Sequence, residues 1–143
     1  MWWTRHLFLI GMQIAAFVPY FIGSKRFYKR EDNFMRWLAI GIILDLIMTF
    51  TPFLVKLPRM QENQGAPWSS ILFIAHITCA GIGMFGFIIM FLYLAYRGPN
   101  RRYPRLRKFQ YVVLFPLWAI GVMIALTNFA TKVAFNMRIY DLL

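Results

Sequence analysis

Five polar side chains that could do chemistry lie inside otherwise apolar stretches of this chain. They are a carboxylic acid, an imidazole, a hydroxyl, a carboxamide and a thiol: Asp45, His76, Thr49, Gln13 and Cys79. An acid and an imidazole in an apolar stretch could relay protons or hold a cationic ligand, because a charge there needs a partner, a cavity or a proton. The structural alternative is a protonated acid that is hydrogen-bonded across a helix bundle.

The depth of these side chains in their apolar runs predicts how they meet. At 1.5 Å per residue, Asp45 lies about 15 Å from Val55 at the end of its run, and His76 lies about 9 Å from Ser70. The difference of about 6 Å is one helical turn, so direct contact would need a tilt or a bridging group. Thr49 lies one turn from Asp45 on the same face and could supply that bridge.

Nitrogen and sulfur ligands near His76 raise the alternative of a bound copper ion. His76 and Cys79 are three residues apart and share a helix face, and Asp45 could approach them. Met48 or Met123 could add a soft sulfur donor, and such ligands suit copper. Against this, the chain has only two histidines and lacks Cys-x-x-Cys, His-x-x-x-His and Met-x-x-Met spacings. We predict no metal site.

Haem and hydrolase chemistry have less support. His6 lies at the boundary of an apolar run and His76 about 9 Å inside one, so the two could not easily clamp one iron. A single His76 ligand is the remaining alternative for haem. No Ser-His-Asp arrangement, glycine-rich phosphate loop or His-Glu-x-x-His motif is present. We therefore predict a protein that is not an enzyme and that holds no cofactor.

Four apolar runs must position these side chains. They are residues 7–23, 37–55, 70–93 and 111–129, each near the ~20 residues that span a ~30 Å hydrocarbon core. With 143 residues, of which 60% are hydrophobic, the chain has room for one domain, residues 1–143. We predict an all-α integral membrane bundle of four transmembrane helices, in which short loops make neighbouring helices antiparallel.

The basic residues predict an orientation for this bundle. Five Lys and Arg fall between the first and second runs and six between the third and fourth, which is 11 of the chain's 16. The positive-inside rule places these two loops in the cytoplasm and both termini outside. Because the formal charge of +11 is concentrated at loops, it serves topology and does not indicate nucleic acid.

The denser of these two loops predicts contacts at the membrane surface. Its basic cluster consists of Arg101, Arg102, Arg105, Arg107 and Lys108. Such clusters attract anionic lipid headgroups, and they can also dock the acidic surface of a partner protein. We expect membrane lipids to be the main partners of this cluster.

Small residues spaced four apart predict where the helices touch. In lipid, close backbone approach replaces hydrophobic burial as the source of helix association. Three runs carry such a face: Gly11 and Ala15 in the first, Ala75, Cys79 and Gly83 in the third, and Gly121 and Ala125 in the fourth.

The order of these features resembles a known family. Residues 73–81 read FIAHITCAG, and the second basic loop precedes residues 117–123, which read LWAIGVM. From its first run to its fourth, the chain resembles a bacterial family of small four-helix membrane proteins implicated in the maturation of haem-copper cytochrome oxidases. The resemblance implies a helper protein of the respiratory chain in the bacterial inner membrane, with membrane-proximal histidines as its functional residues.

Of those histidines, only His76 falls at a matching position. The other two positions lie in residues 31–34, which read EDNF, and residues 103–105, which read YPR. The predicted function is a non-enzymatic accessory or assembly subunit of a larger membrane complex, above all a respiratory cytochrome oxidase. It would contact other membrane subunits or a second copy of itself. Two alternatives stay open: a small oligomeric transporter or proton channel built on Asp45 and His76, and a membrane protein that carries haem or copper.

Overall fold

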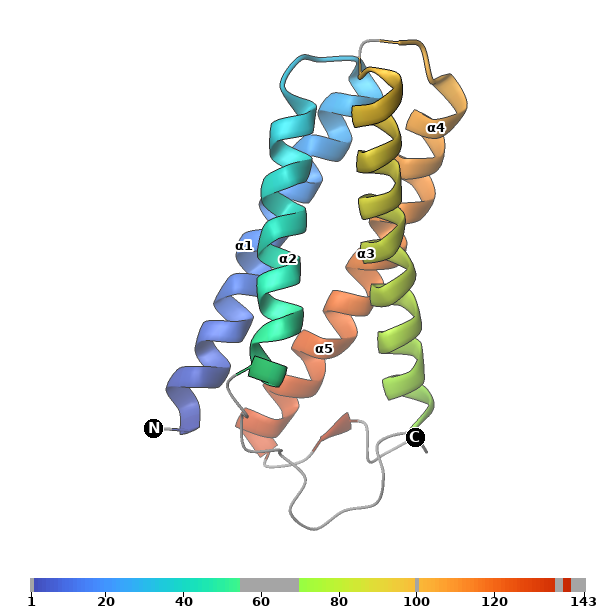
Figure 1. Cartoon of the computed structure of the whole chain (residues 1–143). Helices are drawn as coiled ribbons and strands as arrows, with labels where there is room; N and C mark the ends of the chain where they lie inside the picture. Colours follow the sequence, from blue (N-terminus) through green and yellow to red (C-terminus); the bar gives the residue numbers. More distant parts are fainter. Residues whose placement is uncertain (1, 55–69, 100, 136–137, 140–143) are drawn as a thin grey trace.

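Long helices that run alternately up and down make up the computed structural model, which describes residues 2–54, 70–99, 101–135 and 138–139. The elements, in chain order, are α1 (Trp2–Lys29), α2 (Phe34–Leu54), α3 (Ile71–Arg97), α4 (Pro104–Phe109), the π-helical turn η2 (Gln110–Leu114) and α5 (Phe115–Phe135). The last three follow one another as one helical rod, antiparallel to α3 (Figure 1). The predicted all-α bundle is confirmed.

Three of these helices are long and apolar enough to cross a membrane, which indicates an integral membrane protein. They are α2 over Phe34–Thr51, α3 over Ile71–Arg97, and the rod over Pro104–Phe135. Helix α1 has 28 residues and packs mainly along α2. The start of α1 and the end of α5 lie at the same end of the bundle (Figure 1).

Helix α1 is longer than the apolar run that predicts it. It continues through Lys25, Arg26 and Lys29, because Lys and Arg are good helix formers and their charges can reach out of the apolar layer. The connection to α2 is therefore only residues 30–33, much shorter than the gap between the two runs suggests. Most of the basic residues assigned to this loop lie on the last turns of a helix.

A backbone motif ends α1 sharply. The amide of Arg30 donates to the carbonyl of Phe27 (3.3 Å), and the amide of Glu31 donates to that of Arg26 (2.9 Å). Arg30 takes a φ of 63°, the left-handed conformation in which glycine usually closes such a helix end. Asn33, which tolerates that conformation well, has a φ of 64° just before α2 starts.

The rod formed by α4, η2 and α5 also starts earlier than the fourth apolar run of the sequence. It begins at Pro104, where the lack of an N–H costs nothing and the fixed φ suits a first helical turn. At residues 110–114 it widens into a π turn, in which the amide of Phe115 donates to the carbonyl of Gln110. Pro116 follows and has no N–H to offer the carbonyl of Val112, so a regular α ladder is interrupted at this point in any case.

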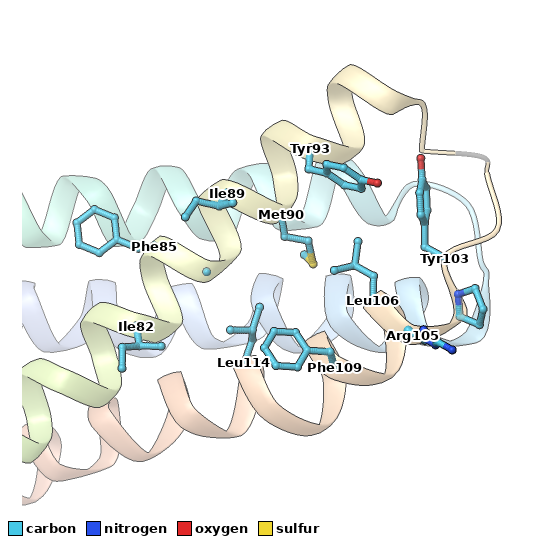
Figure 2. A pocket seen from close by; sticks show the side chains of 12 residues that line it. Ile82, Phe85, Ile89, Met90, Tyr93, Tyr103, Arg105, Leu106, Phe109 and Leu114 are labelled. Carbon is cyan, nitrogen blue, oxygen red and sulfur yellow. The ribbon is translucent and has the colours of Figure 1, made fainter.

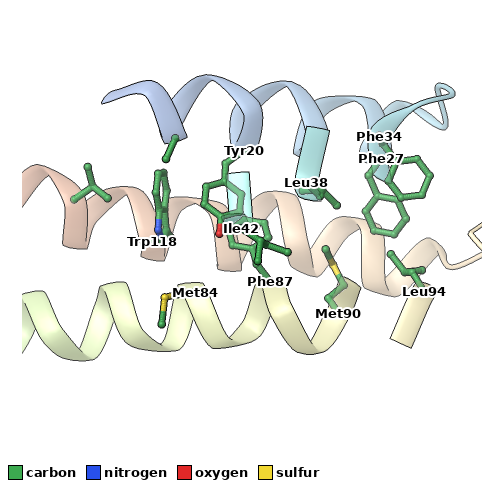
Figure 3. Close-up of a cluster of buried hydrophobic side chains, with 12 residues drawn as sticks. Tyr20, Phe27, Phe34, Leu38, Ile42, Met84, Phe87, Met90, Leu94 and Trp118 are labelled. Carbon is green, nitrogen blue, oxygen red and sulfur yellow. The ribbon is translucent and has the colours of Figure 1, made fainter. Parts of the chain in front are cut away.

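Large side chains fill the space between the helices along the length of the bundle (Figure 3). At its centre the ring of Tyr20 from α1 stacks on Phe87 from α3, with 4.3 Å between the ring centroids. The ring of Trp118 from α5 meets Tyr20 edge-on at 4.6 Å. Both arrangements are favoured by the charge distribution of aromatic rings, so three helices are held together by one aromatic contact group.

Glycines let α3 and α5 approach each other closely, as the small-residue pattern predicts. A Cβ added to Gly121 would lie 2.5 Å from the backbone nitrogen of Ala80, and one added to Gly83 would overlap the Cβ of Trp118. Both contacts involve backbone or the root of a side chain, which cannot move aside. The predicted faces of the third and fourth runs are therefore confirmed at these two glycines.

The small-residue prediction is wrong for α1. Gly11 has no atom within 4 Å of an added Cβ, and Ala15 is exposed. The contact between α1 and α2 is made instead at Gly23, which packs on Leu38, and at Gly41, which packs on the ring of Tyr20. Each of these glycines makes room for a single large side chain. They are therefore not part of a repeat of small residues four apart, which is the pattern that the sequence can reveal.

Candidate functional site

A buried carboxyl group lies at the centre of the bundle. The side chain of Asp45 on α2 is only 3% exposed. Its Oδ2 atom accepts a hydrogen bond from the indole Nε1 of Trp118 at 2.9 Å and from the phenol of Tyr20 at 3.2 Å. One oxygen of this acid therefore ties together α1, α2 and α5.

The neighbouring helices are shaped to present these two donors. Gly41 lies one turn before Asp45 on the same face of α2, and an added Cβ there would meet the ring of Tyr20 at 2.9 Å. Gly83 makes the corresponding room on α3 for Trp118. Because these positions lack side chains, both rings can lie deep in the bundle with their polar atoms at the carboxyl group.

The carboxyl group borders a cavity of about 490 Å³, which we call the Asp45 cavity. Four of the five predicted polar residues line it, together with apolar side chains of α2, α3 and α5: Gln13, Asp45, Thr49 and His76. Gln13 is buried, and Thr49 and His76 are half-buried. The structure thus brings four of the five residues of the predicted polar cluster to one cavity. This cavity could hold a proton or a small cationic ligand next to Asp45.

The bonds within the Asp45 cavity differ from those predicted. The Nδ1 atom of His76 lies 2.7 Å from the backbone oxygen of Gly121, so it acts as the donor, because a carbonyl can only accept. The hydroxyl of Thr49 donates to the sulfur of Met84 at 3.7 Å. The predicted bridge from Asp45 through Thr49 to His76 is wrong, because Asp45 bonds to Tyr20 on α1 and Trp118 on α5, and Thr49 bonds to Met84 on α3 instead of His76.

The candidate copper ligands do not converge. Cys79 is half-buried on α3 and is not among the residues that line the Asp45 cavity, whereas Met48 is. Met123 borders a different cavity beside Pro116 and Ile120. Among the described residues, no three His, Cys, Asp or Glu side chains gather to hold a metal ion. The side chain of His6, the other histidine considered for haem, lies outside the described part.

Compared with protein-family models, with curated proteins and with solved structures, the chain matches none of them. The features of the molecule that bear on its function are therefore the Asp45 cavity, the polar contacts between helices and the surface of the bundle. The family resemblance of the sequence stays a prediction.

Four members of the predicted basic cluster are exposed and could meet lipid headgroups: Arg101, Arg102, Arg105 and Lys108. Arg107 contradicts the prediction, because it is only 8% exposed and its guanidinium lies 5.2 Å from the centre of the Phe27 ring. The reason is that this part of the loop is helical, and a helix turns one of its faces toward α1. Arg107 is thus a packing residue that fastens α4 to α1 through a cation–π contact.

A second buried polar contact, which the sequence analysis does not predict, joins the π turn to α1. The amide Nε2 of Gln110 in the π turn donates to the hydroxyl of Ser24 on α1, and both side chains are fully buried. In lipid, such cross-helix hydrogen bonds hold helices together because neither group has water as an alternative. The pair fixes the π turn against α1.

Tyr20 and Trp118 are the residues of the Asp45 site that sequence reasoning missed. A signal was available for Trp118, which lies seven residues inside its run, away from the run ends where aromatic residues mark the membrane interface. Tyr20 lies only three residues from the end of the first run, where an aromatic residue at the interface is also expected. A buried phenol or indole usually needs a hydrogen-bond acceptor. Asp45 is the one acid within the four apolar runs, so it is the natural acceptor for both.

Proposed function

We propose that this chain is a non-enzymatic accessory or assembly subunit of a larger membrane complex, with a respiratory cytochrome oxidase as the complex that the family resemblance implies. In this proposal it lies in the bacterial inner membrane, with the two basic loops in the cytoplasm and both termini outside. The positive-inside rule supports that orientation. The start of α1 and the end of α5 lie at one end of the bundle, which supports a shared side for both.

The observation that carries the proposal is that buried polar groups are used to join helices. Three contacts of buried or half-buried polar groups link different helices: Asp45 with Tyr20 and Trp118, His76 with the backbone of Gly121, and Gln110 with Ser24. Groups bonded in this way stabilise a bundle of fixed shape. A bundle of fixed shape with a lipid-facing apolar exterior suits a subunit that packs beside others.

Purification in a gentle detergent, followed by native mass spectrometry and an absorption spectrum of the same sample, tests this proposal. We expect respiratory subunits to co-purify, and we expect deletion of the gene in its host to lower the amount of assembled oxidase to a small fraction of normal. The matched control is the deletion strain that carries the gene on a plasmid. A protein that purifies alone, together with normal oxidase in the deletion strain, would refute the proposal.

A specific observation also supports a second candidate, a small oligomeric proton channel or transporter. Asp45 accepts hydrogen bonds from two neutral donors, and no Lys or Arg among the described residues forms an ion pair with it. It borders the Asp45 cavity together with His76. An acid without a cationic partner next to a cavity is the arrangement in which a proton can be taken up and released.

Substitution of Asp45 by asparagine tests the second candidate. Asparagine keeps an acceptor oxygen for Trp118 and Tyr20 but cannot exchange a proton. In vesicles with a trapped pH-sensitive dye, a proton pathway through Asp45 predicts that Asp45→Asn lowers the flux to that of empty vesicles. Asp32→Asn, at an exposed acid in the α1–α2 connection, is the matched control. Equal flux in wild type and Asp45→Asn would exclude the channel.

A further inference from the structure

A large apolar groove opens on the side of the bundle between α3 and the rod that begins at Pro104 (Figure 2). It has a volume of about 1000 Å³, roughly twice that of the Asp45 cavity. We call it the lateral groove and define it by the residues that carry the argument: Ile82, Phe85, Ile89, Tyr103, Arg105 and Phe109. It lies apart from the Asp45 contacts, although Phe85 borders both spaces.

The two ends of the lateral groove differ in chemistry. Figure 2 shows Ile82 and Phe85 at one end and Tyr103 and Arg105 at the other. The apolar end lies in the middle of α3, and the polar end lies next to the connection between α3 and α4. An Arg and a tyrosine at one end of an apolar channel are typical of the headgroup level of a membrane.

The polar end of the groove has a fixed shape. The hydroxyl of Tyr103 donates to the carbonyl of Gly98 at 3.1 Å. The rings of Tyr103 and Tyr93 meet edge-on, with 5.8 Å between their centroids. These contacts hold the start of α4 against the end of α3, so the groove exists before anything enters it.

The charge at this end is unbalanced. Arg101, Arg102 and Arg105 are exposed, and in the described part of the chain none of the three forms an ion pair with an acid. Arg105 itself lines the groove. An occupant that satisfies both ends must therefore carry a negative charge beside Arg105 and a long apolar chain along Phe109, Ile89 and Phe85.

We propose that the lateral groove is a binding site for one anionic phospholipid, with its phosphate at Arg105 and an acyl chain between α3 and the rod. A zwitterionic lipid could place its chain in the groove but would gain less from the uncompensated arginines. A transmembrane helix of a partner or of a second copy would fill the apolar part without using Arg105. The proposal is independent of the accessory function, because a resident lipid site can exist in a subunit or in a channel.

Native mass spectrometry of the purified full-length chain, exchanged into micelles with equal amounts of phosphatidylglycerol and phosphatidylcholine, tests the proposal. We expect one phosphatidylglycerol to be retained in preference to phosphatidylcholine. Arg105→Gln should lower that preference about fivefold, the effect of one basic residue near a headgroup. Lys108→Gln is the matched control, since it removes the same charge from an exposed position on α4 that does not line the groove.

A second variant tests the apolar part of the site. Ile89 is 67% exposed, so Ile89→Trp fills the groove without disturbing the core. It should reduce retention of both lipids, while thermal unfolding in detergent stays unchanged. The proposal is overturned if wild type shows no preference between the lipids, if Arg105→Gln and Lys108→Gln lower the preference equally, or if Ile89→Trp retains lipid normally. A dimer that Ile89→Trp dissolves would also overturn it, in favour of a helix as the occupant.

Discussion

Alanine at Gly83 is expected to destabilise the bundle strongly, whereas alanine at Gly81, two residues earlier on α3, is not. The new Cβ at Gly83 would overlap the Cβ of Trp118 and lie 2.7 Å from its Cα. Neither atom can move without shifting α5, and forced overpacking of this kind costs about 1–3 kcal/mol. A Cβ at Gly81 meets nothing within 4 Å, so that variant should gain up to ~1 kcal/mol from better helix propensity.

Thermal unfolding in detergent, followed by the fluorescence of the tryptophans, measures both variants. The two substitutions make the same chemical change on the same helix, so the difference between them isolates the contact with α5. Gly83→Ala should unfold at a lower temperature than wild type and Gly81→Ala at the same or a higher one. Equal midpoints for the two variants would show that α3 and α5 are not packed as described.

Leucine at Asp45 is expected to be far more damaging than asparagine. Leucine has the same branched arrangement of heavy atoms, with two methyl groups in place of the oxygens, but accepts no hydrogen bond. The indole N–H of Trp118 and the hydroxyl of Tyr20 would therefore be left buried without an acceptor. An unsatisfied buried donor costs about 1–3 kcal/mol, and measured cross-helix hydrogen bonds in membranes lie at the lower end of that range. Asparagine retains an oxygen at the same place and should cost less than about 1 kcal/mol.

The measurement is again thermal unfolding in detergent, with the double variant Asp45→Leu/Trp118→Phe as the control. Phenylalanine removes the indole N–H that leucine leaves unsatisfied, so the double variant should recover part of the loss. If Asp45→Leu were as stable as wild type, the carboxyl would not be a structural link. The proton-channel candidate would then gain, because a costly buried acid with no structural role calls for a functional one.

The architecture of this protein could be predicted because membrane spans carry a strong one-dimensional signal. Apolar runs separated by polar segments predict an alternating helical bundle without any knowledge of side-chain contacts. Three helices of that bundle are long and apolar enough to cross a membrane. Helix ends could not be read from the same signal. Lys25, Arg26 and Lys29 interrupt the hydrophobicity but not the helix, because helix propensity and hydrophobicity are different properties.

The grouping of Gln13, Asp45, Thr49 and His76 around one cavity could be expected from their depths, but their bonds could not. Depth along a helix axis says nothing of which neighbour lies across the contact, and that depends on helix rotation. Rotation is set here by single glycines such as Gly41, whose role is to leave room for one ring. For the same reason, the sequence alone does not distinguish Arg107 from the exposed arginines of its loop.

The π turn at residues 110–114 changes the rotation of side chains about the axis of the rod formed by α4, η2 and α5. In a regular helix each residue advances the side chains by about 100°, so adding or removing one residue rotates everything beyond it. A π turn takes up about one additional residue locally, so it changes the rotation between the two parts of the rod relative to an uninterrupted α-helix. At the start of the rod, Arg107 and Gln110 contact Phe27 and Ser24 of α1, whereas beyond the turn Gly121 packs on Ala80 of α3. The π turn thus lies where the rod changes its main neighbour from α1 to α3.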